Sequence, residues 1–325
     1  MMDIAYAISE SYTDYCLVSL CSLFENNQNE PIRIHILCDN LSEKAKAKLT
    51  TFVHSQNGEI RYYIIPDEKI RDLALNGWTK YAWYRLFLPE LLGTEIQTIL
   101  YLDTDIIISG AIKELFELDL TAHSIAGCQD IMSFSDSIYS RLGYPKEFSY
   151  ICSGVLLINL TYFRQNDLSS QIINFAKNNP DIIQFPDQDA INCVCHSSMK
   201  LLPLKFNILP PFFTNQTFIN AHREEVKEML HDPRIIHYAG CAPWIHESVP
   251  HYFESEFWKY ASIIGGIRKK KLITGMALIK HRVKQILGIM QIPAYKRFNP
   301  KKAPDFSALY TEVIDINKPA IHKKQ

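Results

Sequence analysis

Residues 96–109 read Ile-Gln-Thr-Ile-Leu-Tyr-Leu-Asp-Thr-Asp-Ile-Ile-Ile-Ser, an apolar run that is interrupted by two acids. The apolar residues at 99–102 predict a parallel strand that is buried on both faces. Asp103 and Asp105 end this strand, and three isoleucines follow at once. Because carboxylates between apolar runs are costly to desolvate, we expect positive charge to meet them.

An Asp-x-Asp turn at the carboxyl end of such a strand points both side chains into the crevice where open α/β sheets bind ligands. A hard divalent cation that bridges to a ligand phosphate would supply the charge. The alternative is a solvated turn that happens to contain two aspartates, and the same pattern recurs at residues 187–189. The local pattern alone leaves both interpretations open.

Strand and helix signals alternate through the first half of the chain. We expect strands at 4–8, 32–37 and 59–65, and helices at 16–25, 42–55 and 81–92, with Ser42 capping the second helix. Further strands are expected at 125–128, 155–158 and 235–236, and a helix at Pro186. This order predicts an α/β fold whose mostly parallel central sheet is covered by helices on both faces.

Composition bounds the class of protein. The 325 residues are 47% hydrophobic and 12% aromatic, which excludes a disordered protein and allows one large α/β domain, alone or with an appendage. No apolar run approaches the roughly 18 to 20 residues of a membrane span, and we expect no signal peptide before the first strand. Eight scattered cysteines, mostly in apolar segments, predict reduced, buried thiols in a cytosolic protein.

The net charge of −1 conceals a strong asymmetry. Residues 257–304 contain twelve Lys and Arg but no Asp or Glu, so the remaining 22 basic residues face 35 acidic ones. We expect one large α/β domain at 1–258, a basic arm at 259–304 and a tail at 305–325. Apolar residues of the arm recur on one helical face, which predicts an amphipathic helix on an anionic membrane: Leu272, Met276, Ile279, Val283, Leu287 and Met290. A helix docked on the α/β domain is the alternative.

Phosphate-binding and hydrolase motifs are missing from the sequence. It contains no Gly-x-Gly-x-x-Gly or Walker-type loop, no Gly-x-Ser-x-Gly and no His-Glu-x-x-His. A phosphate-bearing ligand would therefore be held by metal and side chains. His237 ends the short strand at 235–236, and a lone histidine there is more often a core residue than a ligand.

Six landmarks occur in a regular order across residues 3–260. They are Asp3-Ile-Ala-Tyr-Ala with Tyr12, Trp83-Tyr-Arg-Leu86, Tyr101-Leu-Asp-Thr-Asp105, Ser153-Gly-Val-Leu-Leu-Ile-Asn-Leu160, Asp187-Gln-Asp189, and His237-Tyr-Ala-Gly240 with Pro243-Trp244. In order and spacing they resemble family 8 glycosyltransferases, the retaining enzymes that include bacterial lipopolysaccharide galactosyl- and glucosyltransferases. The resemblance implies a GT-A fold that binds UDP-galactose or UDP-glucose.

The resemblance also implies roles for single residues. Asp103, Asp105 and His237 would hold Mn²⁺ or Mg²⁺, an oxygen-rich ligand set that does not suit a closed zinc site. Donor-binding residues would be Ala7, Ser9, Tyr12, Arg85, Asp103, Thr104, Cys152, Ser153 and Gly240. Tyr12 would stack on the base and Arg85 would contact the diphosphate. The catalytic residues would be Asp130 and Asp187, as partners of sugar hydroxyls, and Gln188, near the anomeric carbon.

Three positions depart from the family's pattern. Ser9 stands where an aspartate usually reads the uracil edge, so Ser9 would make a weaker contact, or Glu10 would substitute after local movement. Cys152 stands where asparagine is common and cannot replace its amide. Ala242 stands where a lysine before Pro243 usually reaches the diphosphate. Losing that cation would weaken donor binding by about 1.5 to 3 kcal/mol if nothing compensates.

The implied reaction moves a hexose onto a hydroxyl of a cell-surface glycan, such as lipopolysaccharide core or another lipid-linked glycan, with retention. Gln188 is a poor nucleophile, so we expect the acceptor to attack from the face that the diphosphate leaves. The alternative mechanism is a double displacement in which Asp189 or Asp130 is the nucleophile. The partners would be the donor, the acceptor and an anionic membrane surface, and we expect no binding to nucleic acid. The protein would lie in the cytoplasm, at the inner face of the cytoplasmic membrane. Two alternatives are a weakened relative that serves as a nucleotide- or glycan-binding scaffold, and a nucleotidyltransferase, whose Gly-rich loop is missing.

Overall fold

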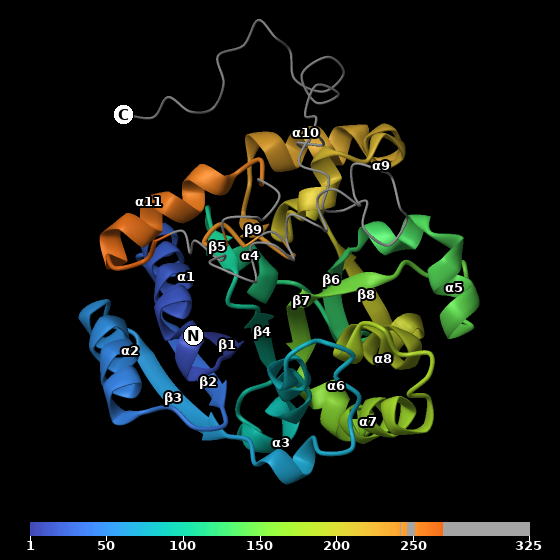
Figure 1. The fold of residues 1–325 in the computed structure, drawn as a ribbon, viewed down its shortest axis with the longest axis horizontal. Helices are drawn as coiled ribbons and strands as arrows, with labels where there is room; N and C mark the ends of the chain where they lie inside the picture. Colours follow the sequence, from blue (N-terminus) through green and yellow to red (C-terminus); the bar gives the residue numbers. More distant parts are fainter. Residues whose placement is uncertain (241, 246–250, 269–325) are drawn as a thin grey trace, which may run out of the picture.

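The computed structural model describes residues 1–240, 242–245 and 251–268 (Figure 1). Within these residues, a seven-stranded sheet has the order β3-β2-β1-β4-β7-β6-β8. Its strands are β1 (Met2–Ala7), β2 (Ile32–Cys38), β3 (Glu59–Ile64), β4 (Thr98–Leu102), β6 (Ile125–Gln129), β7 (Ile151–Asn159) and β8 (Met199–Leu202). Strand β7 runs antiparallel to β4 and β6, and the other pairs of the sheet are parallel. The mostly parallel sheet expected from the sequence is confirmed.

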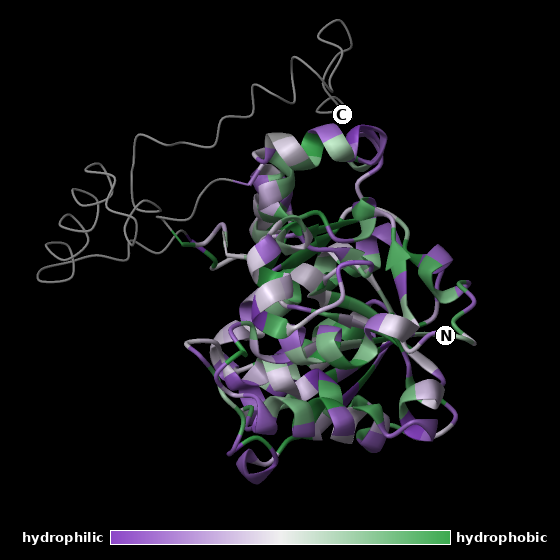
Figure 2. Ribbon diagram, turned by 90° about the vertical axis from the view of Figure 1, so that its right-hand side faces the viewer, coloured by the Kyte–Doolittle hydropathy of each residue, from purple (hydrophilic) through white to green (hydrophobic). Residues whose placement is uncertain are grey.

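Helices cover both faces of this sheet (Figure 1). One face carries α1 (Thr13–Asn26) and α2 (Glu43–Ser55), and the other carries α3 (Leu88–Leu91), α6 (Leu160–Gln165), α7 (Leu168–Asn178) and α8 (Pro186–Cys195). Side chains alternate along β1, so that Ile4 packs under α1 and Ala5 faces the opposite layer. Figure 2 shows hydrophobic residues gathered on the inner strands and hydrophilic ones on the outer turns. The predicted layer architecture is therefore confirmed.

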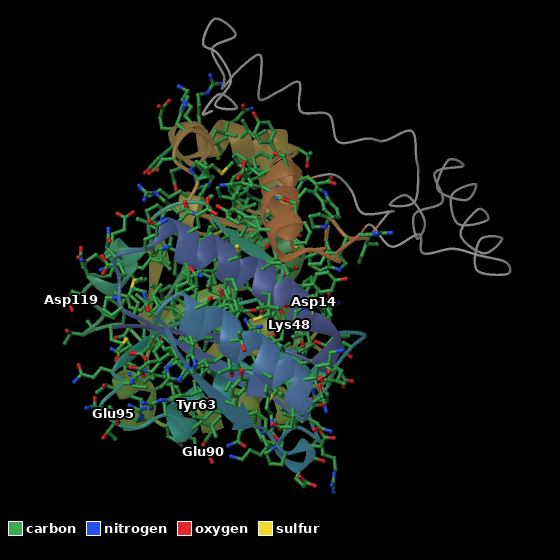
Figure 3. All side chains as sticks on the ribbon, turned by 90° about the vertical axis from the view of Figure 1, so that its left-hand side faces the viewer. Asp14, Lys48, Tyr63, Glu90, Glu95 and Asp119 are labelled. Atoms are coloured by element: carbon green, nitrogen blue, oxygen red, sulfur yellow. The ribbon has the colours of Figure 1, made fainter. Side chains whose placement is uncertain are left out.

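The caps and ties of the first helices follow the sequence closely. Ser42 caps α2, because its hydroxyl accepts a hydrogen bond from the Ala45 N–H at 3.2 Å. Lys48 of α2 forms an ion pair with Asp14 of α1 at 2.5 Å, at the surface of the helical layer (Figure 3). Such an exposed pair orients the two helices but adds little stability.

A second layer of structure lies above the carboxyl edge of β4. Strands β5 (Ile106–Ile108) and β9 (Ile235–His237) form an antiparallel ribbon. Around it lie α4 (Lys113–Phe116), α9 (Gln216–Ala221), α10 (Arg223–His231) and α11 (Glu254–Ile264). Helix α5 (Asp136–Leu142) packs elsewhere, in an apolar cluster with Tyr144 and Tyr150. Helix α11 lies beside α1, with Phe257 and Tyr260 buried in a shared apolar cluster (Figure 1). The expected domain boundary at residue 258 lies inside this helix.

The segment expected as a helix at 81–92 is helical but not one α-helix. It consists of the 3₁₀ segment η3 (Lys80–Phe87) followed by the short α3. Pro89 has no N–H to donate to the Arg85 carbonyl, which instead accepts from Leu88 in the tighter 3₁₀ pattern. The other 3₁₀ segments are η1 (Glu10–Tyr12), η2 (Asp67–Lys69), η4 (Ile131–Phe134), η5 (His196–Ser198), η6 (Leu204–Phe206) and η7 (Pro210–Phe213).

Three further expectations concern the basic arm, membrane-spanning helices and the cysteines. The amphipathic part of the basic arm, from Leu272 onward, lies outside them. Among the helices that are described, none has the length and apolar character needed to cross a membrane. The seven cysteines in the described part are free thiols, six of them buried and Cys193 half-buried, as the sequence predicts.

Candidate active site

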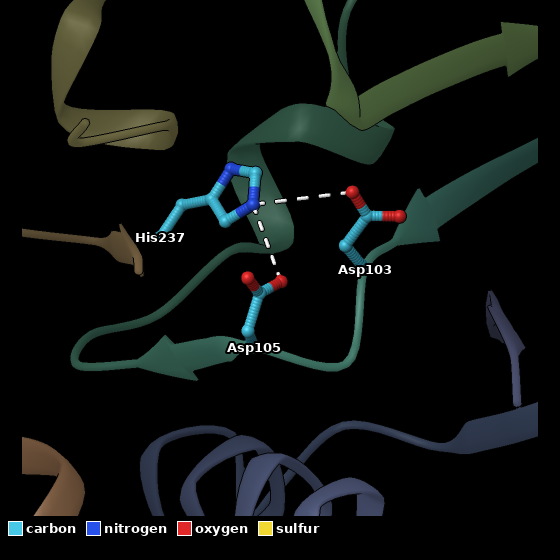
Figure 4. Close-up of side chains that lie close together, drawn as sticks. All are labelled: Asp103, Asp105 and His237. Carbon is cyan, nitrogen blue, oxygen red and sulfur yellow. Dashed lines mark ion pairs between the residues drawn. The ribbon is translucent and has the colours of Figure 1, made fainter. Parts of the chain in front are cut away.

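Two carboxylates and an imidazole meet where the β5–β9 ribbon crosses the end of β4 (Figure 4). Asp103 directly follows β4, and its N–H donates to the Gly154 carbonyl of β7 at 2.9 Å. Asp105 precedes β5, whose Ile106 pairs with His237 of β9. The Tyr238 N–H also donates to the Asp105 carbonyl at 2.9 Å. This register places one ligand atom of each of the three residues within 4.8 Å of the other two.

The imidazole of His237 faces both acids through one nitrogen. Its Nε2 lies 3.3 Å from Asp105 Oδ1 and 3.9 Å from Asp103 Oδ2. Its Nδ1 lies 2.9 Å from Asn207 Oδ1, so the tautomer with a proton on Nδ1 would leave Nε2 free to bind a cation. Burial lowers the pKa of His237, but Asp105 and Cys152 together raise it, so the net shift is upward. A bound divalent cation would displace the Nε2 proton, and this donor set fits Mn²⁺ or Mg²⁺.

Glycine at position 154 is required by the closeness of β7 to this cluster. A Cβ there would overlap the Cε1 of His237 and would lie only 2.8 Å from Asp103 Oδ2. Since Cβ atoms are never found so close to other atoms, a side chain at this position would push both residues apart. Gly154 thus lets the sheet approach the three ligand atoms.

Arg85 is buried between two carboxylates. Its Nη2 lies 2.9 Å from Asp103 Oδ1, and its Nε lies 3.1 Å from Asp187 Oδ2. The guanidinium also donates to the Ser153 carbonyl and lies 4.0 Å from the centroid of the Tyr101 ring. Burial raises the pKa of Asp187 and Arg85 opposes this, with a net upward shift. Arg85 therefore balances the acids of the site, and its contact with a diphosphate stays a prediction.

Gln188 and Asp130 form a second group that lines the same pocket. The Gln188 Oε1 accepts from the Ser153 N–H at 3.0 Å, and its Nε2 donates to Asp130 Oδ2 at 3.3 Å. Asp130 Oδ1 accepts from the Met132 N–H at 2.9 Å, as the cap of η4. Burial raises the pKa of Asp130, and these two hydrogen bonds oppose that shift. The amide of Gln188 is held in one orientation by these partners.

Asp189 has a structural role instead. Its fully buried carboxylate accepts from Arg141 at 2.8 and 3.1 Å, from the Tyr150 hydroxyl at 2.6 Å, and from the N–H groups of Gln184 and Phe185 at 2.7 and 2.9 Å. It does not line the pocket. The geometry therefore disfavours Asp189 as a nucleophile, and Asp130 is the remaining carboxylate for a double displacement.

These groups line one pocket of about 330 Å³. It contains most of the predicted site residues: Arg85, Asp103, Asp105, Asp130, Cys152, Ser153, Asp187, Gln188, His237 and Gly240. Gly240 has a φ of +70°, a conformation that favours glycine, and brings backbone to the pocket wall. Four predicted donor-binding residues do not line it: Ala7, Ser9, Tyr12 and Thr104.

Three of these residues, Ala7, Ser9 and Tyr12, lie at or just after the end of β1, whereas Thr104 lies between the two acids of the metal cluster. Ala7 ends β1, and Ser9 precedes η1, with its hydroxyl 2.9 Å from the Ser11 hydroxyl. Tyr12 is 36% exposed and meets Trp244 edge-on, with 6.3 Å between the ring centroids. Its exposure leaves a ring face to stack on, as the proposed base contact requires.

Sequence reasoning missed the apolar half of the pocket and the residue that orients His237. The missed residues include Trp78, Ala82, Ile131, Met132, Phe185, Leu209, Pro211 and, behind the metal cluster, Asn207. They lie in loops and 3₁₀ segments, where no periodic pattern points toward a site. The run Pro-Pro-Phe-Phe at 210–213 was the one visible signal, an aromatic turn next to prolines.

Comparisons with known proteins agree with this geometry. The chain is 26% identical to a lipopolysaccharide 1,2-glucosyltransferase of Escherichia coli (strain K12), over 79% of each chain. It is 24% identical to a lipopolysaccharide 1,3-galactosyltransferase of Salmonella typhimurium (strain LT2), over 74% of this chain and 72% of that protein. The crystal structure of the galactosyltransferase LgtC with donor and acceptor sugar analogues superposes with a TM-score of 0.73 at 23% identity, covering 81% of this chain and 96% of LgtC.

The LgtC likeness confirms the predicted fold. The family model for glycosyl transferase family 8 matches residues 3–247, which span the sheet, the ribbon and the pocket. The enzyme class expected from the landmarks is thereby confirmed, and the scaffold alternative is not favoured. The chain belongs to glycosyltransferase family 8.

Proposed function

We propose that this enzyme transfers a hexose, galactose or glucose, from a UDP-sugar to a hydroxyl of a glycan, with retention of the anomeric configuration. The observation that carries the proposal is the pocket in which Asp103, Asp105 and His237 converge and which Gln188 and Asp130 also line. One relative is named a glucosyltransferase and another a galactosyltransferase, so glucose and galactose are both candidates for the donor sugar.

The metal site fits Mn²⁺ or Mg²⁺. Two carboxylates and one neutral imidazole would hold the ion, and donor phosphate oxygens would complete its coordination. When bound, such an ion acts as a Lewis acid that neutralises charge on the departing diphosphate. The chain itself contributes the buried cation of Arg85, which forms ion pairs with both Asp103 and Asp187.

The remaining residues orient the sugar. Asp187 Oδ2 is buried and has no hydrogen-bond donor among the described residues, although it forms the ion pair with Arg85. A donor hydroxyl would satisfy this oxygen. Gln188 presents an amide where a double displacement would need a carboxylate, so same-face attack is favoured. The acceptor hydroxyl would then lose its proton to the leaving phosphate oxygen as the new glycosidic bond forms.

The acceptor is proposed from the relatives and from the charge of the chain. Relatives act on lipopolysaccharide, as their names state, so we infer a lipopolysaccharide core or another lipid-linked glycan of the cell surface. The basic arm at 259–304 would hold the enzyme on anionic lipids, where such acceptors lie. The enzyme would therefore work in the cytoplasm, peripherally on the inner face of the membrane.

Donor turnover tests the proposal. The protein is incubated with UDP-galactose or UDP-glucose and Mn²⁺, and UDP release is followed with and without added glycan acceptors. We expect metal-dependent release from at least one donor, and an α-linked product from an α-linked donor by NMR. Nucleotide binding without any release of UDP would support the scaffold alternative, and inversion at the anomeric carbon would refute the proposed stereochemistry.

A further inference from the structure

A second polar group lies at the carboxyl edge of the sheet, beyond the pocket. The parallel register of β1 and β2 pairs residues with a constant offset, from Met2 with Ile32 to Ala7 with Leu37. The Ile8 N–H extends the ladder to the Leu37 carbonyl at 2.9 Å. Continued past the ends of the two strands, the same offset would bring Asp39 to the level of Ser9, at the edge where parallel sheets bind ligands.

The order of strands sets the distance of this position from the metal cluster. Strand β1 lies between β2 and β4, so Asp39 and Asp103 stand at the ends of strands that are two positions apart (Figure 1). Two strand spacings are about 10 Å. A nucleotide with its diphosphate at Asp103 would extend across β1 and bring its base to the end of β2.

Asp39 forms an ion pair with Lys80 that is partly exposed to solvent. Its Oδ2 lies 2.7 Å from the Lys80 Nζ, its Oδ1 accepts from the Asn40 N–H at 2.7 Å, and the Tyr81 hydroxyl lies 3.1 Å from both oxygens. Lys80 also pairs with Asp67 at 2.7 Å. The side chains of Asp39 and Lys80 are 27% and 25% exposed. A carboxylate accepts about four hydrogen bonds and an ammonium donates three, so each group has one position left.

A buried hydroxyl next to this pair lacks a partner. Tyr84 is fully buried and meets Tyr81 edge-on, with 5.1 Å between the ring centroids. Its OH makes no hydrogen bond among the described residues. Burial raises the pKa of Tyr84, with Lys80 and Asp39 as the strongest charges acting on it. An unsatisfied buried polar group marks a place where a bound molecule or an ordered water completes the hydrogen bonding.

The polar side chains at the end of β1 are already engaged. The Ser9 hydroxyl is 2.9 Å from the Ser11 hydroxyl. The Glu10 carboxylate accepts from the N–H and the hydroxyl of Ser42 at 2.9 and 2.7 Å, and so ties η1 to the start of α2. The end of β1 therefore offers no cation beside its carboxylate, whereas Asp39 and Lys80 place an acid and a cation side by side at the end of β2.

We propose that Asp39 and Lys80 read the edge of the uracil ring of the donor. Uracil presents an N3–H donor beside the O4 acceptor, and a carboxylate beside an ammonium presents the complementary acceptor and donor. Asp39 would accept from N3–H and Lys80 would donate to O4. The inference rests on the proposed nucleotide-sugar donor, and it assigns base recognition to β2 and η3 instead of the end of β1.

Calorimetry with two probes tests this inference on the full chain. UDP and inorganic pyrophosphate are titrated, each with Mn²⁺, into the wild type and Asp39→Ala. The variant loses a charge-assisted hydrogen bond to the base, which UDP has and pyrophosphate lacks. We therefore expect the UDP dissociation constant to rise about tenfold. The pyrophosphate constant should stay within about twofold. A variant that fails to fold would lose both ligands, so Lys80→Met provides a second variant with the same expectation.

Asp67→Ala is the matched control, since it removes the other partner of Lys80 at a position that is 68% exposed. Its UDP constant should match that of the wild type. Equal UDP affinity in wild type, Asp39→Ala and Lys80→Met would overturn the inference while leaving the proposed function intact. A parallel loss of UDP and pyrophosphate in both variants would also overturn it, because it would show a structural role. A wild type that binds neither probe would overturn the proposed function and this inference with it.

Discussion

The guanidinium of Arg85 lies 2.9 Å from Asp103, one of the three residues of the candidate metal site. The same side chain lies 3.1 Å from Asp187, and it is only 3% exposed. One buried cation therefore balances two acids, of which one would bind the ion and the other the sugar. This arrangement links the stability of the fold to the chemistry of the pocket.

Replacing Arg85 with methionine should destabilise the fold strongly. The change leaves Asp103 and Asp187 buried or half-buried without their cation, and breaking a buried pair costs about 3 to 5 kcal/mol. Urea denaturation would measure the free energy of unfolding of the wild type, Arg85→Met and Arg85→Lys. The lysine variant keeps the charge and should lose less. Equal stability of all three proteins would show that the acids do not depend on this cation.

Asp130→Asn should stabilise the protein, increasingly so as the pH rises. Burial raises the pKa of Asp130, so the folded protein holds this proton more tightly than the unfolded chain, whose pKa is near 3.8. The stability contributed by Asp130 is present below that value and is lost as pH rises through the folded pKa. Asparagine mimics the neutral acid but does not ionise, so the variant should not lose stability at this position as the pH rises.

Urea denaturation of the wild type and Asp130→Asn between pH 4 and pH 8 would measure the effect. The difference in the free energy of unfolding, variant minus wild type, should grow with pH and then level off above the folded pKa. A difference that stays constant over this range, or that shrinks, would contradict the burial argument.

Much of the fold follows from the sequence because its signals are local. Continuous apolar runs gave the strands of the buried sheet, and Ser42 marked the start of α2. The segment around Arg85 was less predictable, since its 3₁₀ form depends on Pro89, and since Arg85 pairs with acids that are distant in the sequence. Local propensity does not encode such long-range contacts.

The site was predictable to a similar extent and for a related reason. Asp103 and His237 end apolar strands and fit one family's order, so they could be named before their distance was known. Asn207 could not, because its role arises only when η6 and β9 meet. The Asp39–Lys80 pair likewise depends on where η3 packs against the end of β2.

Placing a cation at position 242 should strengthen donor binding. Ala242 directly precedes Pro243, where the family resemblance implies a lysine that reaches the diphosphate. Ala242→Lys should lower the UDP dissociation constant about tenfold, since about 1.4 kcal/mol corresponds to that factor. Calorimetry with UDP and Mn²⁺ would measure it, with Ala242→Met as the control of similar length without charge. An equal gain in both variants would attribute the effect to apolar contact, and no gain would mean that another group fills the role.

Removing the arm should abolish membrane binding without unfolding the enzyme. Helix α11 continues to Ile264, with Tyr260 buried against the body of the protein, so the cut belongs after Arg268. Residues 1–268 should keep UDP affinity but no longer sediment with anionic liposomes, whereas the full chain should sediment and be released by salt. Full-length protein that ignores these vesicles at low salt would refute the membrane role, and a truncated form that unfolds would make the arm part of the domain.

The central claim is that donor binding runs through a divalent cation held by Asp103, Asp105 and His237, and calorimetry of UDP binding tests it most directly. Wild type, Asp103→Asn and Asp105→Asn would each be titrated with UDP, once with Mn²⁺ and once with EDTA. The wild type should bind UDP strongly only with Mn²⁺, and both variants should lose this metal-dependent binding while keeping the far-UV circular dichroism of the wild type. Equal UDP affinity in all three folded proteins, with and without Mn²⁺, would contradict the account.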